Sequence, residues 1–161
     1  MSSHRSFRGQ SAEGHVLGNH SYNHDPNHAV TQKGVWDIAL AQKAIFQVTG
    51  VKPNLYRPPH GKKSPWELQY LNKQNIIEVT WSDTTNELRA KSPEAIAKQI
   101  IRHAKPGRII LLHDGYGNDH EVRKADRTPT VKSLPIIIKT LQNEGYAFVT
   151  APDLLDVPEY H

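Results

Sequence analysis

Residues 109–115 read Ile-Ile-Leu-Leu-His-Asp-Gly, and this stretch decides which fold the chain is predicted to adopt. Four consecutive apolar residues give a strand that is apolar on both faces, which is typical of a central parallel strand covered on both sides. His113 follows the run directly, so its imidazole is expected to emerge at the carboxyl end of a buried strand. Taken alone, a histidine that is simply hydrogen-bonded at a strand end explains His113 equally well.

Outward from this strand, extended and helical patterns alternate at least four times with short connections, which predicts a parallel α/β sheet or barrel. Strands are expected at 15–18, 55–57, 76–81, 109–112 and 147–150. Helices are expected over 31–50, from 64 through 71, from 92 to a stop at 105–107, from 128 to a stop at 145, and as a short turn over 152–155. Residues 1–13 show no periodicity and predict an irregular arm, so that one domain covers 14–161.

Polar clusters follow the predicted strands, at 20–24, 57–61, 81–87 and 113–115. In parallel α/β folds the functional residues lie on the loops after the carboxyl ends of the strands. Four such clusters at four strand ends therefore indicate a functional site more strongly than any one of them alone.

The first cluster places two imidazoles four residues apart, at His20 and His24. One helical turn would bring both to the same face, where neutral imidazoles could bind one divalent metal ion. The second cluster is Arg57-Pro58-Pro59-His60-Gly61, where two prolines stiffen the backbone and Arg57 can orient a carboxylate with two hydrogen bonds. A rigid structural turn is the alternative interpretation of that stretch.

Composition excludes several classes of function. The 161 residues include no cysteine, so disulfides, thiolate metal sites and cysteine nucleophiles are absent, and any metal must be held by His, Asp or Glu. The formal net charge is +4, but the basic residues are scattered, so nucleic-acid binding has little support. Residues 1–10 lack the apolar core of a signal peptide, and no run of apolar residues has the length of a membrane span. The sequence therefore predicts a soluble chain without a targeting signal.

Three motifs together carry a family resemblance. N-H-S-Y-N-H at 19–24, Y-R-P-P-H-G at 56–61 and I-I-L-L-H-D-G at 109–115 resemble the second, third and fifth motifs of the polysaccharide deacetylases, carbohydrate esterase family 4 with its NodB-type homology domain. The resemblance implies a deformed (β/α) barrel of the seven-stranded type, here lacking its first strand or strands. It also implies metal-dependent removal of acetyl groups from N-acetylated or O-acetylated sugar polymers such as peptidoglycan or chitin oligomers.

The resemblance also implies a role for individual residues. His20 and His24 would be metal ligands, usually for Zn²⁺, and Arg57 would orient the catalytic carboxylate. The backbone N–H of His60 would help bind the oxyanion, and His113 would be the general acid that protonates the leaving amine. The substrate-binding residues would be Leu111, which lines the pocket for the acetyl methyl group, together with Pro59, Trp81 and Leu88.

Two departures from the family pattern stand out. The fourth motif should end in Asp-Trp, but here Glu87 and Leu88 occupy those positions, with Asp83 as an alternative acid. Glu87 can still pair with His113, whereas Leu88 removes a surface on which a sugar could stack. The family's first motif supplies a catalytic base and a third metal ligand as two Asp residues, yet residues 1–18 contain no Asp.

Glu13, Asp25, His28 and Asp114 are the nearest candidates for the missing ligand or base, but each is better explained as a solvent-exposed or capping residue. The expectation is therefore an N-terminally truncated deacetylase domain with impaired activity. Its alternative is a non-catalytic remnant that binds glycan or serves in assembly. A homodimer covering the missing strand is a further expectation. Many relatives are exported to the cell envelope, so the localisation stays open.

Overall fold

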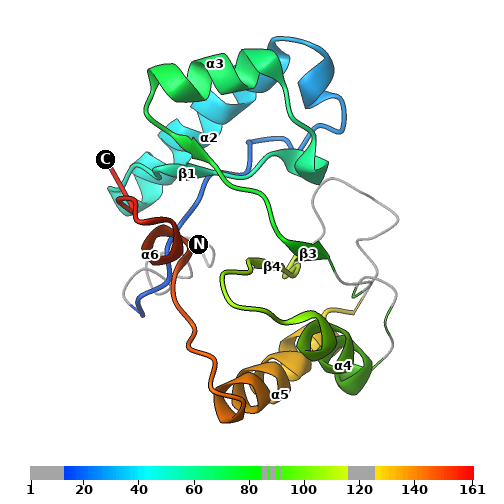
Figure 1. Cartoon of the computed structure of the whole chain (residues 1–161). Helices are drawn as coiled ribbons and strands as arrows, with labels where there is room; N and C mark the ends of the chain where they lie inside the picture. The colour runs from blue at the N-terminus through cyan, green and yellow to red at the C-terminus, as the bar shows by residue number, and fades with distance from the viewer. Residues whose placement is uncertain (1–12, 85–86, 88–89, 91, 116–125) are drawn as a thin grey trace. The chain divides into compact units, whose positions relative to one another are not determined.

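A computed structural model describes residues 13–84, 87, 90, 92–115 and 126–161, with Asp83 and Thr84 described by their backbone alone (Figure 1). The chain divides into two compact units. The first comprises residues 1–80 and 150–161, and the second comprises residues 81–149. None of the helices in the described ranges has both the length and the apolar character needed to cross a membrane.

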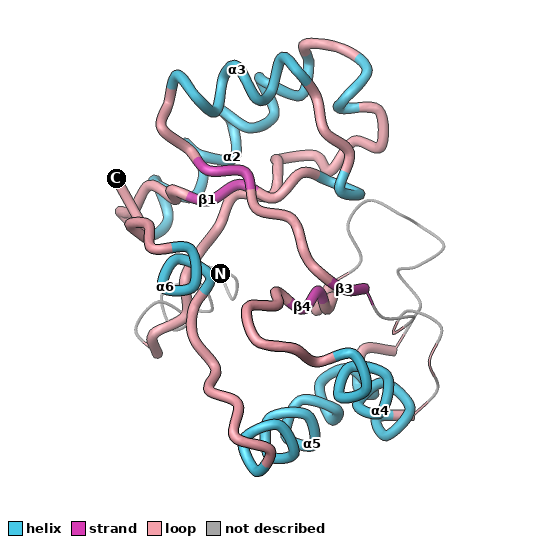
Figure 2. Tube along the Cα trace, in the orientation of Figure 1, coloured by secondary structure: helices cyan, strands magenta, loops and turns pink. Residues whose placement is uncertain are grey.

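The first unit contains two long helices beside a short parallel sheet (Figure 2). Its elements are η1 (His28–Val30), α2 (Lys33–Thr49), β1 (Leu55–Tyr56), η2 (Pro59–Gly61), α3 (Pro65–Lys73), β2 (Ile77–Glu78) and α6 (Ala151–Leu155). Helix α2 ends as the sequence predicts, because Gly50 takes the left-handed conformation at φ 79° and donates its N–H to Phe46. Helix α3 begins as predicted, because the Ser64 hydroxyl accepts from the backbone N–H of Glu67.

Strands β1 and β2 are parallel, with Leu55 opposite Ile77. On the other edge of β1, Asn19 forms a parallel bridge, donating its N–H to Leu55 at 2.8 Å and accepting from the Arg57 N–H at 2.9 Å. The strand expected at 15–18 does not form: the N–H of Leu17 donates to the Tyr160 hydroxyl at 3.1 Å instead of to a neighbouring strand. The first unit therefore places the residues after Asn19 and after β1 at the same edge.

Helices α2 and α3 lie side by side in Figure 1 and enclose one core. Ile38 from α2, Leu71 from α3, Tyr56 from β1 and Ile76 before β2 are each at most 5% exposed. Burial, helped by the nearby carboxylates of Glu67, Glu78 and Asp37, raises the pKa of the Tyr56 hydroxyl well above its ordinary value.

The second unit contains a helix pair and a second short parallel sheet. Its elements are β3 (Asp83–Thr84), α4 (Pro93–His103), β4 (Ile110–Leu111) and α5 (Thr128–Asn143). Helices α4 and α5 pack around a core that comprises Ile96, Ala97, Ile100, Ile137 and Leu141. The predicted caps again hold, since the Ser92 hydroxyl accepts from the backbone N–H of Ala95 at 3.2 Å.

Two strand predictions for the second unit differ from the structure: the strand expected at 109–112 forms only as β4, over Ile110–Leu111, and the strand expected at 147–150 does not form. The run at 109–112 was expected to be buried on both sides, but Ile110 and Leu111 are only half-buried. Ile110 and Leu112 pack against the α4–α5 core, so the alternation of side chains along a strand turns Leu111 to the other face. Residues 147–150 form no strand; Thr150 instead caps α6, with its hydroxyl accepting from the N–H of Asp153.

The observed architecture is mixed α/β with parallel strand pairing, which confirms the α/β part of the predicted fold class. The seven-stranded deformed barrel stays a prediction. Among the described residues the strands form two separate two-stranded sheets, β1–β2 and β3–β4. Helix boundaries follow the sequence closely, and the strands are much shorter than expected.

Candidate active site

A buried asparagine anchors the loop that carries the first two histidines. Asn19 is 1% exposed and donates its side-chain amide to the carbonyl of Ile38 at 3.0 Å and to the amide oxygen of Gln42 at 2.9 Å. Its own amide oxygen accepts from the backbone N–H of Ser21 at 2.9 Å. Helix α2 therefore fixes the position at which His20 leaves the sheet edge.

A second side chain of α2 shapes the rest of the loop. The Asp37 carboxylate accepts from the backbone N–H groups of Tyr22 at 3.2 Å and Asn23 at 2.9 Å. Ser21 and His24 take left-handed conformations, at φ 65° and φ 52°. The helical turn expected for His20 to His24 is therefore wrong, and the loop brings the two residues together through two backbone reversals held by Asn19 and Asp37.

Three imidazoles gather at this edge of the first unit. The ring centroids of His20 and His24 are 4.9 Å apart, and those of His24 and His60 are 4.8 Å apart. The family resemblance implies a role only for the backbone N–H of His60, so the position of its ring beside His24 is a new observation. The spacing of the motifs gives no signal for it, because His60 lies 36 residues beyond His24 in the chain and comes from a different strand end.

The protonation of His20 suits a metal ligand. Its Nδ1 lies 2.6 Å from the carbonyl oxygen of Arg57, which can only accept, so Nδ1 carries the proton. In the neutral ring Nε2 then holds the lone pair that a divalent ion binds, and the backbone carbonyl fixes the orientation of the ring. Among the described residues no group of three or more His, Asp or Glu side chains is arranged to hold an ion. The two histidines thus fit part of a metal site.

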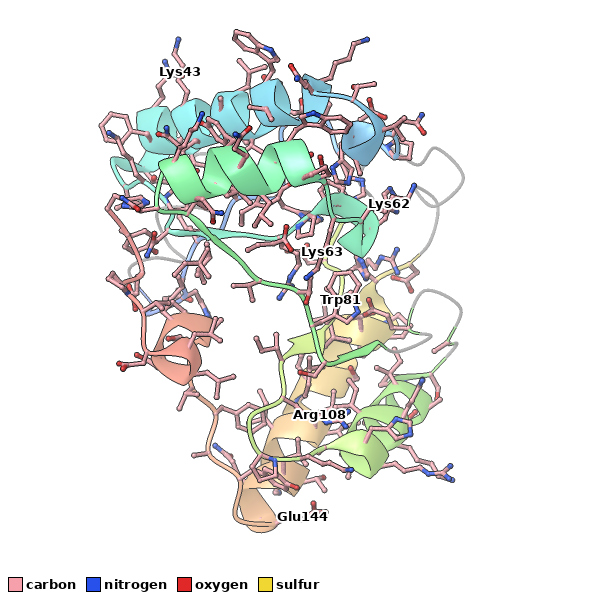
Figure 3. The ribbon with its side chains drawn as sticks, turned by 45° about the horizontal axis from the view of Figure 1, so that its top comes forward. Lys43, Lys62, Lys63, Trp81, Arg108 and Glu144 are labelled. Carbon is pink, nitrogen blue, oxygen red and sulfur yellow. The ribbon has the colours of Figure 1, made fainter. Side chains whose placement is uncertain are left out.

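The loop after β1 is rigid and turned back on itself. Pro59 is buried in η2, and His60 takes a left-handed conformation at φ 55° and ψ 12°. Lys62, labelled in Figure 3, donates to the carbonyl of Pro26 at 2.7 Å and so ties this loop to the segment after His24. The Arg57 guanidinium donates to the carbonyls of Val79 and Thr80 at 3.4 Å each, and its burial lowers the pKa of the group.

The second unit carries a histidine–carboxylate pair. His113 follows β4, and its Nδ1 lies 2.5 Å from the carboxylate of Glu87, which is 4% exposed. With Nδ1–H donating to the carboxylate, Nε2 is the ring nitrogen left for proton transfer. Glu87 is therefore the acid that contacts His113, whereas the side chain of the alternative acid, Asp83, is not described.

The predicted substrate-binding residues are divided between the units. Pro59 lies in the first unit, and the half-buried Leu111 and Trp81 lie in the second, where Figure 3 labels Trp81. Leu88 lies outside the described residues. The roles of these four residues in binding a sugar stay predictions.

The four candidates for the missing ligand or base differ in burial and in their hydrogen bonds. Glu13, Asp25 and Asp114 are exposed, as expected, and the carboxylate of Asp25 accepts from the backbone N–H of Asn27 at 2.8 Å in the turn before η1. His28 departs from the expectation, because it is 1% exposed and makes two buried hydrogen bonds. His28 is the first residue of the short helix η1, and its position four residues after His24 in the sequence gave no sign that it would be buried.

Comparisons with known proteins agree with the motifs. The model of the polysaccharide deacetylase family matches residues 3–79. The chitooligosaccharide deacetylase of Azorhizobium caulinodans is 31% identical over 146 residues, which are 87% of this chain and 69% of that protein. The chain therefore belongs to the polysaccharide deacetylase family. A peptidoglycan-N-acetylglucosamine deacetylase of Bacillus cereus is also 31% identical over 144 residues, but this chain spans only 50% of its length.

Solved structures give the same result. The crystal structure of the Bc1960 peptidoglycan N-acetylglucosamine deacetylase superposes with a TM-score of 0.87 at 26% identity, covering 98% of this chain and 71% of that one. A family 4 acetyl xylan esterase from Clostridium thermocellum, in complex with a cobalt ion, gives a TM-score of 0.80 at 29% identity over 99% of this chain and 74% of that one. Both are carbohydrate-modifying hydrolases by name, and they differ in the substrate named.

Proposed function

We propose that this chain is a metal-dependent deacetylase module that hydrolyses N-acetyl groups on sugar polymers, with peptidoglycan or chitin oligomers as the substrate class. The observation that carries the proposal is the pair His20 and His24, whose rings are 4.9 Å apart, with the Nδ1 proton of His20 directed to the Arg57 carbonyl. The names of the relatives support the substrate class, and the cobalt ion of the acetyl xylan esterase supports a divalent metal.

In this proposal His20 and His24 would hold the metal, with Zn²⁺ as the first choice. A bound divalent ion would polarise the acetamide carbonyl and lower the pKa of a water molecule. His113 would donate a proton from Nε2 to the leaving amine, and the Glu87 carboxylate would hold the ring and stabilise its imidazolium form. The backbone N–H of His60 would donate to the oxyanion. We also propose that the domain that carries these residues has the deformed (β/α) barrel fold of the family.

A second candidate function has its own support. The described residues contain no group of three side chains arranged to hold an ion, and catalytic zinc normally takes three protein ligands. A non-catalytic module that binds acetylated glycan is therefore the alternative. The predicted homodimer stays a prediction, which sedimentation equilibrium of the metal-loaded chain tests.

Release of acetate separates the two functions. The chain, incubated with Zn²⁺ and an N-acetylated chitin oligomer, is expected to release acetate slowly, because only two ligands come from the described residues. His113→Ala should lower that rate by roughly a hundredfold or more, as loss of a general acid does. His20→Ala should lower both the rate and the bound zinc, and His103→Ala is the control histidine on α4. Oligomer binding by calorimetry without acetate release would favour the non-catalytic alternative.

A further inference from the structure

The proposed function does not use the most deeply buried ionisable pair of the first unit. His28 and Glu67 are 1% and 0% exposed, and His28 Nδ1 lies 2.7 Å from Glu67 Oε1. On the other side of the ring, His28 Nε2 lies 3.0 Å from the carbonyl oxygen of Pro59. A chain of hydrogen bonds therefore runs from the first turn of α3, through η1, to the loop that contains His60.

The Pro59 contact fixes where the ring proton lies. A carbonyl oxygen only accepts, so His28 Nε2 must carry a hydrogen. If Glu67 is ionised, Nδ1–H donates to the carboxylate and the ring is an imidazolium; if Glu67 is protonated, the carboxyl group donates to Nδ1. Both arrangements leave Nε2–H directed at Pro59. The pair thus holds this hydrogen bond in either protonation state.

Holding the Pro59 carbonyl also orients the next amide. The carbonyl of Pro59 and the N–H of His60 belong to one planar trans peptide group, so they point in opposite directions. The same oxygen accepts from the backbone N–H of Lys62 at 3.1 Å, which gives it two donors. His60 itself is in the left-handed region at φ 55°, a conformation that surrounding contacts must stabilise in a residue with a side chain.

A glycine of α2 packs directly against the His28–Glu67 pair. A Cβ atom on Gly34 of α2 would lie 1.9 Å from Glu67 Oε1 and 2.8 Å from the carbonyl oxygen of His28. Only glycine therefore fits at position 34. The backbone of α2 packs directly against the Glu67 carboxylate and prevents it from moving toward that helix. The second oxygen of Glu67 is buried without a hydrogen-bond partner among the described residues. A buried carboxylate with an unpaired oxygen is an unusual choice for packing alone.

We infer that His28 and Glu67 are positioning residues that aim the backbone N–H of His60 by clamping the carbonyl of the same peptide group. The inference deepens the proposed function and rests on it for the role of the His60 N–H in binding the oxyanion. Neither residue touches the substrate; Glu67 holds His28, and His28 holds the peptide.

The test begins with the unaltered chain, labelled with ¹⁵N on its histidine rings. Spectra of these rings should show His28 with a slowly exchanging proton on Nε2. A bare Nε2 on His28 would overturn the inference without any variant. The His60 amide resonance should shift in His28→Phe, which keeps an aromatic ring but removes both hydrogen bonds. It should stay close to its original position in Glu67→Gln, whose amide can donate to Nδ1 and so preserve Nε2–H.

Turnover gives the second readout. With Zn²⁺ and the N-acetylated chitin oligomer, His28→Phe should lower kcat by about tenfold to a hundredfold with KM within about twofold, because the oxyanion donor is misaligned but present. Glu67→Gln should keep most of the rate of the unaltered chain, because it preserves Nε2–H on His28. Ser64→Ala is the matched control, since it removes the cap of the helix that carries Glu67 and should lower Tm without moving kcat or the His60 amide.

The two failures can be told apart. A chain without any turnover would contradict the deacetylase function. The His60 amide resonance in His28→Phe would still show whether His28 and Glu67 orient the Pro59–His60 peptide group. Active enzyme in which His28→Phe leaves both kcat and the His60 amide unchanged would overturn the positioning role. If His28→Phe fails to fold, His28→Phe combined with Glu67→Leu replaces both polar groups by apolar ones and must give the same kcat loss.

Discussion

At the scale of single residues, Glu67 makes the stability of the first unit depend on pH. Burial raises the pKa of its carboxyl above the ordinary 4.5, and the hydrogen bond from His28 only partly opposes the shift. The folded chain therefore keeps the Glu67 proton to a higher pH than the unfolded chain does. Between 4.5 and the raised pKa the native state binds more protons, so the contribution of this group to stability is lost as the pH rises.

Glu67→Gln should remove this contribution to the pH dependence. We expect the free energy of unfolding of Glu67→Gln minus that of the unaltered chain to increase as the pH rises above 4.5, because Gln has no proton to lose. Urea unfolding at several pH values measures the two curves. Parallel curves for the two chains would contradict a raised pKa at Glu67.

Residue identity predicted the candidate site only in part. The contact between Glu87 and His113 could be anticipated because the two residues fall at motif positions of the family. The burial of His28 against Glu67 could not, since 39 residues separate them and each has a polar side chain that is usually exposed. Gly34 gave the one available signal: a glycine near the start of a predicted helix indicates either a poor helix or a close approach.

At the scale of elements, local signals fixed the helices. Ser64, Ser92 and Thr150 each cap the helix that begins after them, and the proline that follows each start occupies the first turn. These contacts reach only a few residues along the chain, so a single sequence contains all the information. Strand extent depends instead on a distant partner, which is why 76–81 shortened to two residues and 147–150 formed no strand.

Gly50 tests the contribution of a helix end. It has φ 79°, and a Cβ atom added to it would meet nothing within 4 Å. Gly50→Ala should therefore destabilise the chain through backbone strain alone, by about 1 kcal/mol. Gly115 is the matched control, because it also has open space but no positive φ, so Gly115→Ala should change the unfolding free energy by less than about 0.5 kcal/mol. Equal effects in the two variants would contradict strain as the cause.

At the scale of the whole molecule, the candidate residues belong to two units with separate cores. His20, His24 and His60 lie in the first unit, around the core of Ile38 and Leu71, and His113 lies in the second. The single domain predicted over 14–161 stays a prediction; motif order and strand ends could not have indicated that the contacts cluster into two units. Two cores allow the proposed metal ligands and the proposed general acid to respond differently to a bound ion.

Zinc binding should stabilise the first unit preferentially. An ion that binds only the folded state raises the stability of that state by about 2.7 kcal/mol when the free ion concentration is a hundred times Kd. This stabilisation should be greatest for the elements that hold the proposed ligands. We expect Zn²⁺ to slow hydrogen exchange in α2 and β1, which hold the His20 loop through Asn19 and Asp37, and in α3, which packs against α2. Exchange in α4 and α5 should change much less. His20→Ala should abolish the protection, whereas His103→Ala, on α4, should keep it. Equal protection across both units would show that they unfold together, and protection that survives in His20→Ala would place the ion elsewhere.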